Sequence, residues 1–359
     1  MERILSPFSQ EELLGRPSPP LSLVGAEELI GGRRVAITGA AGSVGGPLAR
    51  VIAALRPDLL LLIDHHEHSL FRLRTEMTEQ GGPPTRWVLA DIRDHRKMER
   101  VFRDSRPEVI FHLAAYKHVP LGEENPDQTV EVNLLGTRVL VESAAQFGAV
   151  RFVYPSSDKA VDPPSVYGST KRIAERMMQA ADRELVTGFS VVRFVNIVGT
   201  RGSVIETLAA QIAAGRPLTL TDPGMTRYWI TMPEATRLLV QAASHQQTGV
   251  VFMPDTGPAI KLTDLARHLC RLLSGNQCDY PIRYIGARPG ERMHEVLLSR
   301  NESAMPTPYP GILEVSYSRT DIPRYDEISR MVDELLALAS KDRAEELRRR
   351  IIDLAHSLQ

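Results

Sequence analysis

A glycine-rich turn, TGAAGSVG over residues 38–45, follows a short run of strand-forming residues and opens a helical pattern. Its glycines stand at positions 39, 42 and 45. In strand–turn–helix units of this kind, the first glycine permits the tight turn and the second lets the backbone approach a pyrophosphate. The third lets the helix pack closely on the sheet, and the helix N-terminus then faces the phosphates. The turn therefore predicts a parallel α/β sheet that binds a dinucleotide.

Strand-like and helix-like runs alternate from residue 33 to residue 194. The strand-like runs, rich in aliphatic and β-branched residues, lie at 34–38, 59–63, 86–89, 109–113, 151–154 and 190–194. Amphipathic stretches separate them, at about 43–55, 67–79, 94–104, 124–147 and 166–183. Strands that alternate with helices of this length form parallel sheets with helices on both faces. We therefore predict an α/β protein with a Rossmann-type, doubly wound parallel sheet.

The pattern changes after Phe194, where glycine, proline and arginine become frequent. Open α/β sheets bind ligands outside the carboxyl ends of their strands, so we expect this later part to cover those ends as a smaller C-terminal lobe. The predicted organisation is an N-terminal arm over residues 1–30, an NAD-binding domain over 31–195, a mainly substrate-binding lobe over 196–322 and two charged amphipathic helices over 323–359.

The charges of the chain are almost balanced. Among its 359 residues, 43 Lys and Arg stand against 44 Asp and Glu, which gives a formal net charge of −1. Proteins that coat nucleic acids carry excess positive charge, so no nucleic-acid partner is expected. The aliphatic run Leu59–Ile63 is far shorter than the roughly 20 residues that span a bilayer, and the N-terminal residues lack the apolar core of a signal peptide. We therefore expect a cytoplasmic protein with no membrane insertion.

Polar residues after the second and third predicted strands are expected around the adenosine half of the cofactor. Asp64 ends the second run, where a carboxylate accepts hydrogen bonds from ribose hydroxyls and repels a 2′-phosphate. NAD is therefore predicted rather than NADP, although Arg72 and Arg74 could pair with a phosphate. Asp91 and Ile92 lie where the adenine edge is expected, although Asp91 can equally be an ordinary aspartate at the end of a strand. No metal site is predicted, because no cysteine or carboxylate set completes a coordination shell around the histidines at 65, 66 and 68.

Tyr167 and Lys171 form a Y-x-x-x-K pattern at the start of a predicted helix. The spacing places both side chains on one helical face, about one turn apart. A lysine ammonium beside a phenol favours the phenolate, so we expect Lys171 to lower the pKa of Tyr167 from about 10 toward the working pH. Tyr167 is thus a candidate general base toward a sugar hydroxyl while hydride leaves the same carbon.

Three polar residues, Ser157, Asp158 and Lys159, precede this pair at the end of the fifth predicted strand. A neighbouring carboxyl and ammonium group can divide proton transfers, one taking a C–H proton and the other protonating a leaving hydroxyl. The same two groups can equally form an ordinary ion pair in a loop. Their position in the sequence does not decide between these two interpretations.

Several longer segments resemble the CapD-like polysaccharide-biosynthesis proteins, which are nucleotide-sugar 4,6-dehydratases and 4-epimerases of the extended short-chain dehydrogenase/reductase superfamily. The matching segments are TGAAGSVG (38–45), FHLAAYKHVPLGEENP (111–126), SSDKAVDPPSVYGSTK (156–171), RFVNIVGTRGSVI (193–205), MTRYWITMPEA (225–235) and RPGERMHEVL (288–297). The segment EELLGRPSPPLSL (11–23) resembles the stretch that joins the membrane half of large members to their catalytic half. We expect a free-standing member without that membrane half.

The resemblance implies a set of site residues. The implied catalytic set is Ser157, Asp158, Lys159, Tyr167 and Lys171. Small soluble members keep tyrosine at position 167, whereas large membrane-bound ones often carry methionine. The implied cofactor contacts are Gly39, Gly42, Ser43, Val44, Gly45, Asp64, Asp91, Ile92, Ala114, Ala115, Tyr167 and Lys171. Lys117 and His118 would lie over the sugar ring, and the nucleotide diphosphate and ribose would be held by Asn196, Arg201, Ser203, Arg227, Arg288 and Glu291.

The resemblance and the motifs together favour an NAD-dependent nucleotide-sugar 4,6-dehydratase that acts on UDP-N-acetylglucosamine or a close relative. C4 would be oxidised, water eliminated across C5 and C6, and hydride returned to C6. A UDP-sugar 4-epimerase, which needs only Tyr167 and Lys171, and a 5,6-dehydratase are the enzymatic alternatives. An NAD-binding regulator or scaffold is the non-enzymatic one. The helices near 124–147 and 166–183 suit a homo-oligomer interface by analogy with the fold.

Overall fold

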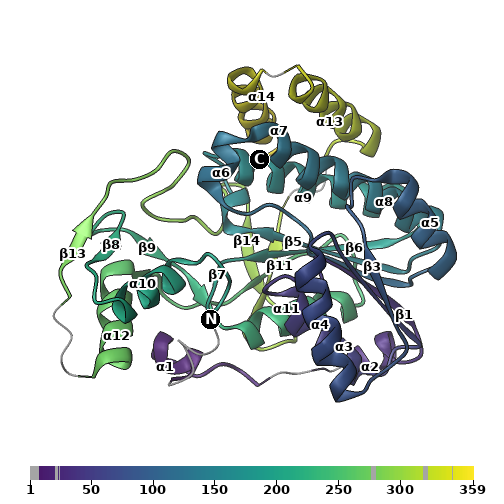
Figure 1. Cartoon of the computed structure of the whole chain (residues 1–359). Helices are drawn as coiled ribbons and strands as arrows, with labels where there is room; N and C mark the ends of the chain where they lie inside the picture. Colours follow the sequence, from purple (N-terminus) through teal and green to yellow (C-terminus); the bar gives the residue numbers. More distant parts are fainter. Residues whose placement is uncertain (1–7, 21–22, 24, 276–279, 318–321, 342) are drawn as a thin grey trace.

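A computed structural model gives the fold of residues 8–20, 23, 25–275, 280–317, 322–341 and 343–359. Within these residues, one sheet of nine strands runs through the molecule in the order β14-β15-β11-β6-β5-β4-β1-β2-β3 (Figure 1). Its strands are β1 (Arg34–Thr38), β2 (Leu59–Asp64), β3 (Thr85–Leu89), β4 (Val109–His112), β5 (Arg151–Ser157), β6 (Gly188–Phe194), β11 (Val251–Pro254), β14 (Ser303–Pro306) and β15 (Ile312–Ser316).

Strands β1 to β6 are all parallel to one another. Their order reverses between β1 and β4, so the chain winds outward in both directions from this point, as in a Rossmann fold. Residues of β1, β2, β4, β5 and β6 are buried on both sides of the sheet, which is why these strands read as continuous apolar runs in the sequence. The predicted fold class is confirmed.

Helices cover both faces of the sheet (Figure 1). One face shares its apolar core with α2 (Ala26–Ile30), α3 (Gly45–Ala54), α4 (Glu67–Gln80) and α11 (Met232–Ser244). The other face shares its core with α5 (His95–Ser105), α8 (Gly136–Gln146) and α9 (Val166–Glu184). Between β4 and α8 the chain forms α6 (Val119–Glu124), α7 (Pro126–Val130) and a π-helical turn (Glu131–Leu135).

The range 196–322 is not a single lobe in space. Its helix α11 packs on the sheet, and its strand β11 pairs in parallel with β6. Strands β15 and β14 then extend the same edge in antiparallel fashion. Sequence periodicity does not reveal this return, because β11 is only four residues long and β14 is exposed along its whole length. The carboxyl half of the chain therefore completes the sheet as well as covering it.

The rest of this range forms the small lobe. It consists of α10 (Val204–Ala213), α12 (Leu262–Ser274) and three short strand pairs, which are β7 (Asn196–Ile197) with β10 (Trp229–Ile230), β9 (Thr226–Arg227) with β12 (Ile260–Lys261) and β8 (Leu218–Leu220) with β13 (Ile282–Tyr284).

The described part of the N-terminal arm connects this lobe to the sheet domain. Helix α1 (Gln10–Leu14) buries Leu13 and Leu14 in the apolar core of the lobe. Two residues further on, Arg16 forms a bidentate ion pair with Glu234 of α11, at 2.6 and 3.2 Å. Residues 1–7, 21–22 and 24 of the predicted arm lie outside the described residues.

Helix α9 is enclosed by the chain itself. The C-terminal helices α13 (Tyr325–Ala339) and α14 (Ala344–Ser357) pack over its outer side (Figure 1). As a result, α9 is buried from Val166 to Ala181. The sequence suggests that the helix at 166–183 suits an interface between copies of the chain. The surface of α9 is instead covered by α13 and α14 of the same chain.

A buried ion-pair network also holds α9 to the sheet. Arg172 and Arg193 pair with Glu175 and Glu302 at 2.9–3.2 Å, and none of the four side chains is more than 3% exposed. Arg193 lies on β6, whereas Glu302 lies just before β14, in the segment that returns to the sheet. The network therefore connects the helix that carries Tyr167 to two distant parts of the chain.

Candidate active site

A cavity of about 1130 Å³ lies at the carboxyl ends of the parallel strands, between the sheet domain and the small lobe. The structure brings nearly all of the predicted site residues to its wall. Those that line it are Gly39, Gly42, Ser43, Val44, Gly45, Asp64, Asp91, Ile92, Ala114, Ala115, Lys117, His118, Ser157, Lys159, Tyr167, Lys171, Asn196, Arg201, Ser203, Arg227, Arg288 and Glu291. Asp158 does not line the cavity, since it lies behind Ser157 and Lys159 and is only 1% exposed.

The glycine-rich turn can pack closely against its own helix and the neighbouring strand end only because Gly39 and Gly45 lack side chains. Gly39 has a φ of 63°, and a Cβ there would lie 2.7 Å from the Ala114 nitrogen. A Cβ on Gly45 would lie 2.2 Å from the Gly39 carbonyl oxygen. Helix α3 begins at Gly45, so its free N–H groups face the cavity. This cradle and helix end fit a dinucleotide diphosphate.

The two acidic residues after β2 and β3 already have partners. Asp64 accepts hydrogen bonds at 2.9 Å from the backbone N–H groups of Ala41 and His66, which fix its carboxylate beside the glycine-rich turn. Asp91 accepts several hydrogen bonds from Arg93, which lower the pKa of Asp91. Carboxylates have further lone pairs, so both side chains can still accept from a ligand in the cavity.

The environment of Tyr167 differs from the expected one. The Lys171 ammonium donates to the Pro155 carbonyl at 2.8 Å and lies 4.6 Å from the centre of the Tyr154 ring. Burial raises the pKa of Tyr167 above its ordinary value, and the charge that most opposes this rise is that of Lys159. The expectation that Lys171 lowers this pKa is therefore wrong for the protein without ligands. Burial instead lowers the pKa of Lys171 to about 7.

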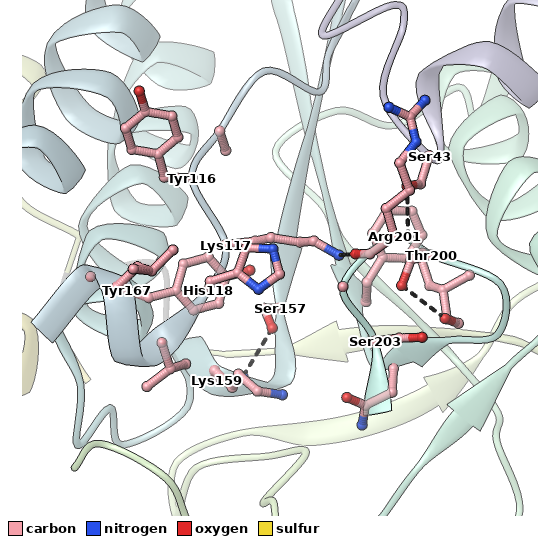
Figure 2. A pocket seen from close by; sticks show the side chains of 18 of the residues that line it. Ser43, Tyr116, Lys117, His118, Ser157, Lys159, Tyr167, Thr200, Arg201 and Ser203 are labelled. Carbon is pink, nitrogen blue, oxygen red and sulfur yellow. Dashed lines mark hydrogen bonds between the residues drawn. The ribbon is translucent and has the colours of Figure 1, made fainter. Parts of the chain in front are cut away.

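Ser157, Asp158 and Lys159 form one hydrogen-bonded group at the end of β5. The Ser157 hydroxyl donates to Asp158 Oδ1 at 2.9 Å, and the Lys159 ammonium donates to the same oxygen at 3.0 Å. The Lys159 backbone N–H donates to the Ser157 hydroxyl at 3.3 Å, as the dashed line in Figure 2 shows. The second oxygen of Asp158 is buried without a hydrogen-bond partner.

Lys159 also contacts a second carboxylate, that of Glu295, at 3.2 Å. Burial alone would lower the pKa of Lys159, but Asp158 and Glu295 outweigh it and raise this pKa above its ordinary value. Lys159 is therefore an ammonium in the protein without ligands. Sequence reasoning missed Glu295, although the segment RPGERMHEVL contains it, because its contact with Lys159 depends on how the lobe folds back over the sheet.

Lys117 and His118 project into the middle of the cavity, near Tyr167 (Figure 2). The Lys117 ammonium donates to the Arg201 carbonyl at 3.0 Å, and burial lowers its pKa. Burial, with the nearby Lys117, also lowers the pKa of His118. A lysine and a histidine at this place can donate hydrogen bonds to a polar ligand between the turn and the lobe.

The arginines of the lobe are arranged differently from the expected diphosphate clamp. The Arg201 guanidinium donates to the Ala41 carbonyl at 2.9 Å, and its backbone N–H donates to the Ser43 hydroxyl at 3.0 Å, so Arg201 lies across the glycine-rich turn (Figure 2). Arg227 donates instead to backbone carbonyls of the lobe, at residues 226, 292 and 293.

The other residues expected at the nucleotide end take part in local hydrogen bonds of the lobe. Arg288 is exposed at the cavity edge, and its backbone N–H donates to the Glu291 carboxylate at 3.1 Å. Asn196 donates to the Tyr228 carbonyl at 3.1 Å. The Ser203 hydroxyl caps α10. The Arg288 guanidinium is thus the expected diphosphate ligand that the cavity leaves most accessible.

Within the described residues, no helix is both long and apolar enough to cross a bilayer.

Comparisons with known proteins agree with this arrangement. Probable polysaccharide biosynthesis protein EpsC of Bacillus subtilis (strain 168) is 40% identical over 304 residues, which are 84% of this chain and 51% of EpsC. This chain thus spans about half the length of EpsC. A UDP-N-acetylglucosamine 4,6-dehydratase (inverting) of Campylobacter jejuni is 28% identical over 302 residues, 83% of this chain and 86% of the dehydratase. A UDP-glucose 4-epimerase of Rickettsia akari is 28% identical over 294 residues, which are 80% of this chain and 83% of the epimerase.

Among solved structures, Pen from Bacillus thuringiensis superposes with a TM-score of 0.75 at 27% identity, covering 86% of this chain and 98% of Pen. The family described as "Polysaccharide biosynthesis protein" matches residues 35–317, which include the glycine-rich turn, the Ser157–Lys171 segment and most of the lobe. This match confirms the resemblance seen in the sequence: the chain belongs to the polysaccharide biosynthesis protein family.

Proposed function

We propose that this chain is a nucleotide-sugar 4,6-dehydratase that acts on UDP-N-acetylglucosamine or a close relative. The observation that carries the proposal is the Asp158–Lys159 ion pair beside Ser157 and Tyr167. A 4-epimerase needs a base at the C4 hydroxyl but no acid–base pair for elimination. The similarity to the Campylobacter jejuni dehydratase supports the same reaction, while the similarity to the Rickettsia akari epimerase makes epimerisation the alternative to test.

The cradle at the glycine-rich turn supports a dinucleotide cofactor, and we propose NAD. The turn and the first N–H groups of α3 would hold the diphosphate, and Asp64 would accept from the adenosine ribose hydroxyls. The negative charge of Asp64 beside the ribose would repel the 2′-phosphate of NADP. When bound, the nicotinamide supplies the chemistry of accepting hydride from C4 and returning it to C6.

The side chains of this chain would perform the proton transfers. Tyr167 must first lose its own proton to solvent, because only the phenolate can take the proton of the C4 hydroxyl. The 4-ketone then acidifies the C5 proton. Lys159 must be neutral to remove that proton, so its own proton first passes to Asp158 across their 3.0 Å contact. Asp158 then protonates the departing C6 hydroxyl through the Ser157 hydroxyl, which separates it from the cavity. The ion pair thus becomes a neutral acid and a neutral base with no change in net charge.

The reaction in D₂O tests this proposal. The protein is incubated with UDP-N-acetylglucosamine and NAD, and the product is analysed by mass spectrometry and NMR. A dehydratase gives a sugar lighter by one water, with solvent deuterium at C5. An epimerase gives a sugar of unchanged mass with C4 inverted and no deuterium at C5, and this result would overturn the proposal.

Two variants separate the steps. Asp158→Asn should block water loss, with an expected decrease of about 10²–10⁴-fold in rate, while hydride transfer from C4 partly survives as enzyme-bound NADH. Tyr167→Phe should suppress even this first transfer. Equal loss of bound NADH in both variants would show that Asp158 does not act specifically in the elimination.

A further inference from the structure

Glu295 is a buried carboxylate in the wall of the cavity, 7% exposed. Its Oε1 lies 3.2 Å from the Lys159 ammonium and 3.6 Å from Nε of Arg227. Burial of a carboxylate is costly unless it is paired, and here the two partners come from different parts of the fold. Lys159 follows β5 of the sheet domain, whereas Arg227 lies on β9 of the lobe.

The backbone that carries Glu295 is fixed from two sides. On the lobe side, Arg227 donates to the carbonyls of Arg292 and Met293 at 2.9 and 3.2 Å, and the Thr226 N–H donates to the Met293 carbonyl at 3.1 Å. On the sheet side, the Arg292 guanidinium donates to the backbone carbonyls of residues 161 and 162, in the turn just after Lys159. The position of Glu295 relative to Lys159 is therefore set by these hydrogen bonds to backbone carbonyls as well as by their ion pair.

The charges around Lys159 show what Glu295 adds. If Asp158 were its only carboxylate partner, the Lys159 ammonium could turn toward Asp158 and away from the cavity. Glu295 lines the cavity and Asp158 does not, so Glu295 is the carboxylate that keeps the ammonium at the cavity wall. When Lys159 loses its proton, Arg227 still neutralises the charge of Glu295.

We propose that Glu295 is a positioning residue for the elimination, which holds the Lys159 amine at the cavity wall while its proton passes to Asp158. This inference rests on the proposed dehydratase function. In the transfer, one N–H bond of the Lys159 ammonium breaks and one O–H bond forms on Asp158. Glu295 neither gains nor loses a proton, and its charge stays paired with that of Arg227.

The test compares Glu295→Gln with Glu295→Asp and with Glu79→Gln, an exposed position on α4 far from the cavity. The chain has six lysines, so [13Cε]lysine NMR can follow the titration of Lys159 in the ligand-free protein, with Lys159→Arg used for assignment. Loss of one opposite charge at this distance should lower the titration midpoint of Lys159 by about 1 pH unit or more in Glu295→Gln.

Turnover gives the second readout. In Glu295→Gln, we expect deuterium incorporation at C5 to slow by about tenfold or more and the pH profile of turnover to move to lower pH. Formation of bound NADH should change much less. Glu295→Asp should recover part of the C5 exchange, and Glu79→Gln should behave as the wild type.

The outcomes distinguish this inference from the proposed function. If the wild type releases no dehydrated product, the proposed function fails, whatever Lys159 does. If the wild type is a dehydratase but Lys159 titrates at the same pH in Glu295→Gln as in the wild type, the role of Glu295 is disproved. Equal slowing of bound NADH formation and C5 exchange would also disprove it, because a merely structural role would affect both steps. Should Glu295→Gln not fold, the same criteria apply to Glu295→Ala, which also removes the charge.

Discussion

Arg201 of the small lobe donates a 2.9 Å hydrogen bond from its guanidinium to the carbonyl of Ala41 in the glycine-rich turn of the sheet domain. A second contact runs from the Arg201 N–H to the Ser43 hydroxyl, at 3.0 Å. A lobe residue therefore bridges the cleft above the cradle in which the cofactor diphosphate is proposed to bind. A dehydratase regenerates its cofactor in every cycle, so retaining it between cycles is an advantage.

Replacing Arg201 should loosen this bridge. We expect Arg201→Ala to release bound NADH about tenfold faster, as the loss of one charged hydrogen bond of about 1.5 kcal/mol implies. Stopped-flow fluorescence of NADH displacement measures this rate. The control is Arg216→Ala, an exposed arginine of the same lobe. Equal release rates in the two variants would contradict a role of Arg201 in cofactor retention.

Asp64 should set the choice between NAD and NADP. Its carboxylate accepts from the Ala41 and His66 N–H groups, and Asn at this position keeps an acceptor while removing the charge. We expect the wild type to bind NAD more tightly than NADP. In Asp64→Asn, the ratio of the dissociation constants for NADP and NAD should fall by about tenfold, because the repulsion of a 2′-phosphate is lost. Isothermal titration with each dinucleotide measures the ratio. Tighter binding of NADP by the wild type would refute the proposed role of Asp64.

Lys171 should make stability depend on pH in a defined direction. Burial lowers its pKa in the folded protein to about 7, below the value of about 10.4 in an unfolded chain. The folded protein thus binds fewer protons than the unfolded chain between these values, so the destabilisation by Lys171 is complete below pH 7 and decreases as the pH rises. Relative to wild type, Lys171→Met should gain most stability near pH 6 and progressively less toward pH 9.

Urea unfolding of the cofactor-free proteins at several pH values tests this. The full effect is on the order of a few kcal/mol, at about 1.4 kcal/mol per pKa unit. The lost hydrogen bond to Pro155 shifts all values equally, so only the slope with pH is diagnostic. A stability difference that does not change with pH would show that Lys171 is not desolvated as the structure indicates.

Gly168, next to Tyr167, is required for the close approach of α9 to the turn at Lys159. A Cβ at this position would lie 2.1 Å from the Lys159 carbonyl oxygen. We expect Gly168→Ala to cost about 1–3 kcal/mol of stability by overpacking and to slow turnover by displacing Lys159. Gly82→Ala is the matched control, because a Cβ there meets nothing within 4 Å. Thermal unfolding should separate the two variants, and equal melting temperatures would contradict the tight packing.

The local parts of the fold are those that the sequence predicts well. The turn at 38–45 and the runs that become β1 and β2 carry their own signals, since glycine spacing and apolar content act over a few residues. The edge strand β14 carries a weaker signal, because an exposed edge strand needs no apolar run, and β15 beside it is a short strand with only two buried residues. Their place in the sheet follows only from how the chain returns to pair beside β11.

The same distinction applies to the cavity. Tyr167 and Lys171 are recognisable because they stand four positions apart on one helix. Glu295 and the orientation of Arg201 are not, since each depends on where the lobe rests on the sheet domain. The direction of the Tyr167 pKa shift could not be predicted from its neighbours in the sequence either, because burial raises this pKa against the opposing charge of Lys159.

The buried network of Arg172, Glu175, Arg193 and Glu302 has a consequence for how the protein folds. Within residues 31–195, two of these guanidinium groups would face the carboxylate of Glu175 alone, and an uncompensated buried charge is strongly destabilising, by about 3–5 kcal/mol. Glu302 supplies the missing carboxylate from near the end of the chain. The charges in the interior of the sheet domain are therefore balanced only when a residue from near the end of the chain is in place, so we expect residues 31–195 to fold cooperatively with the segment that carries Glu302.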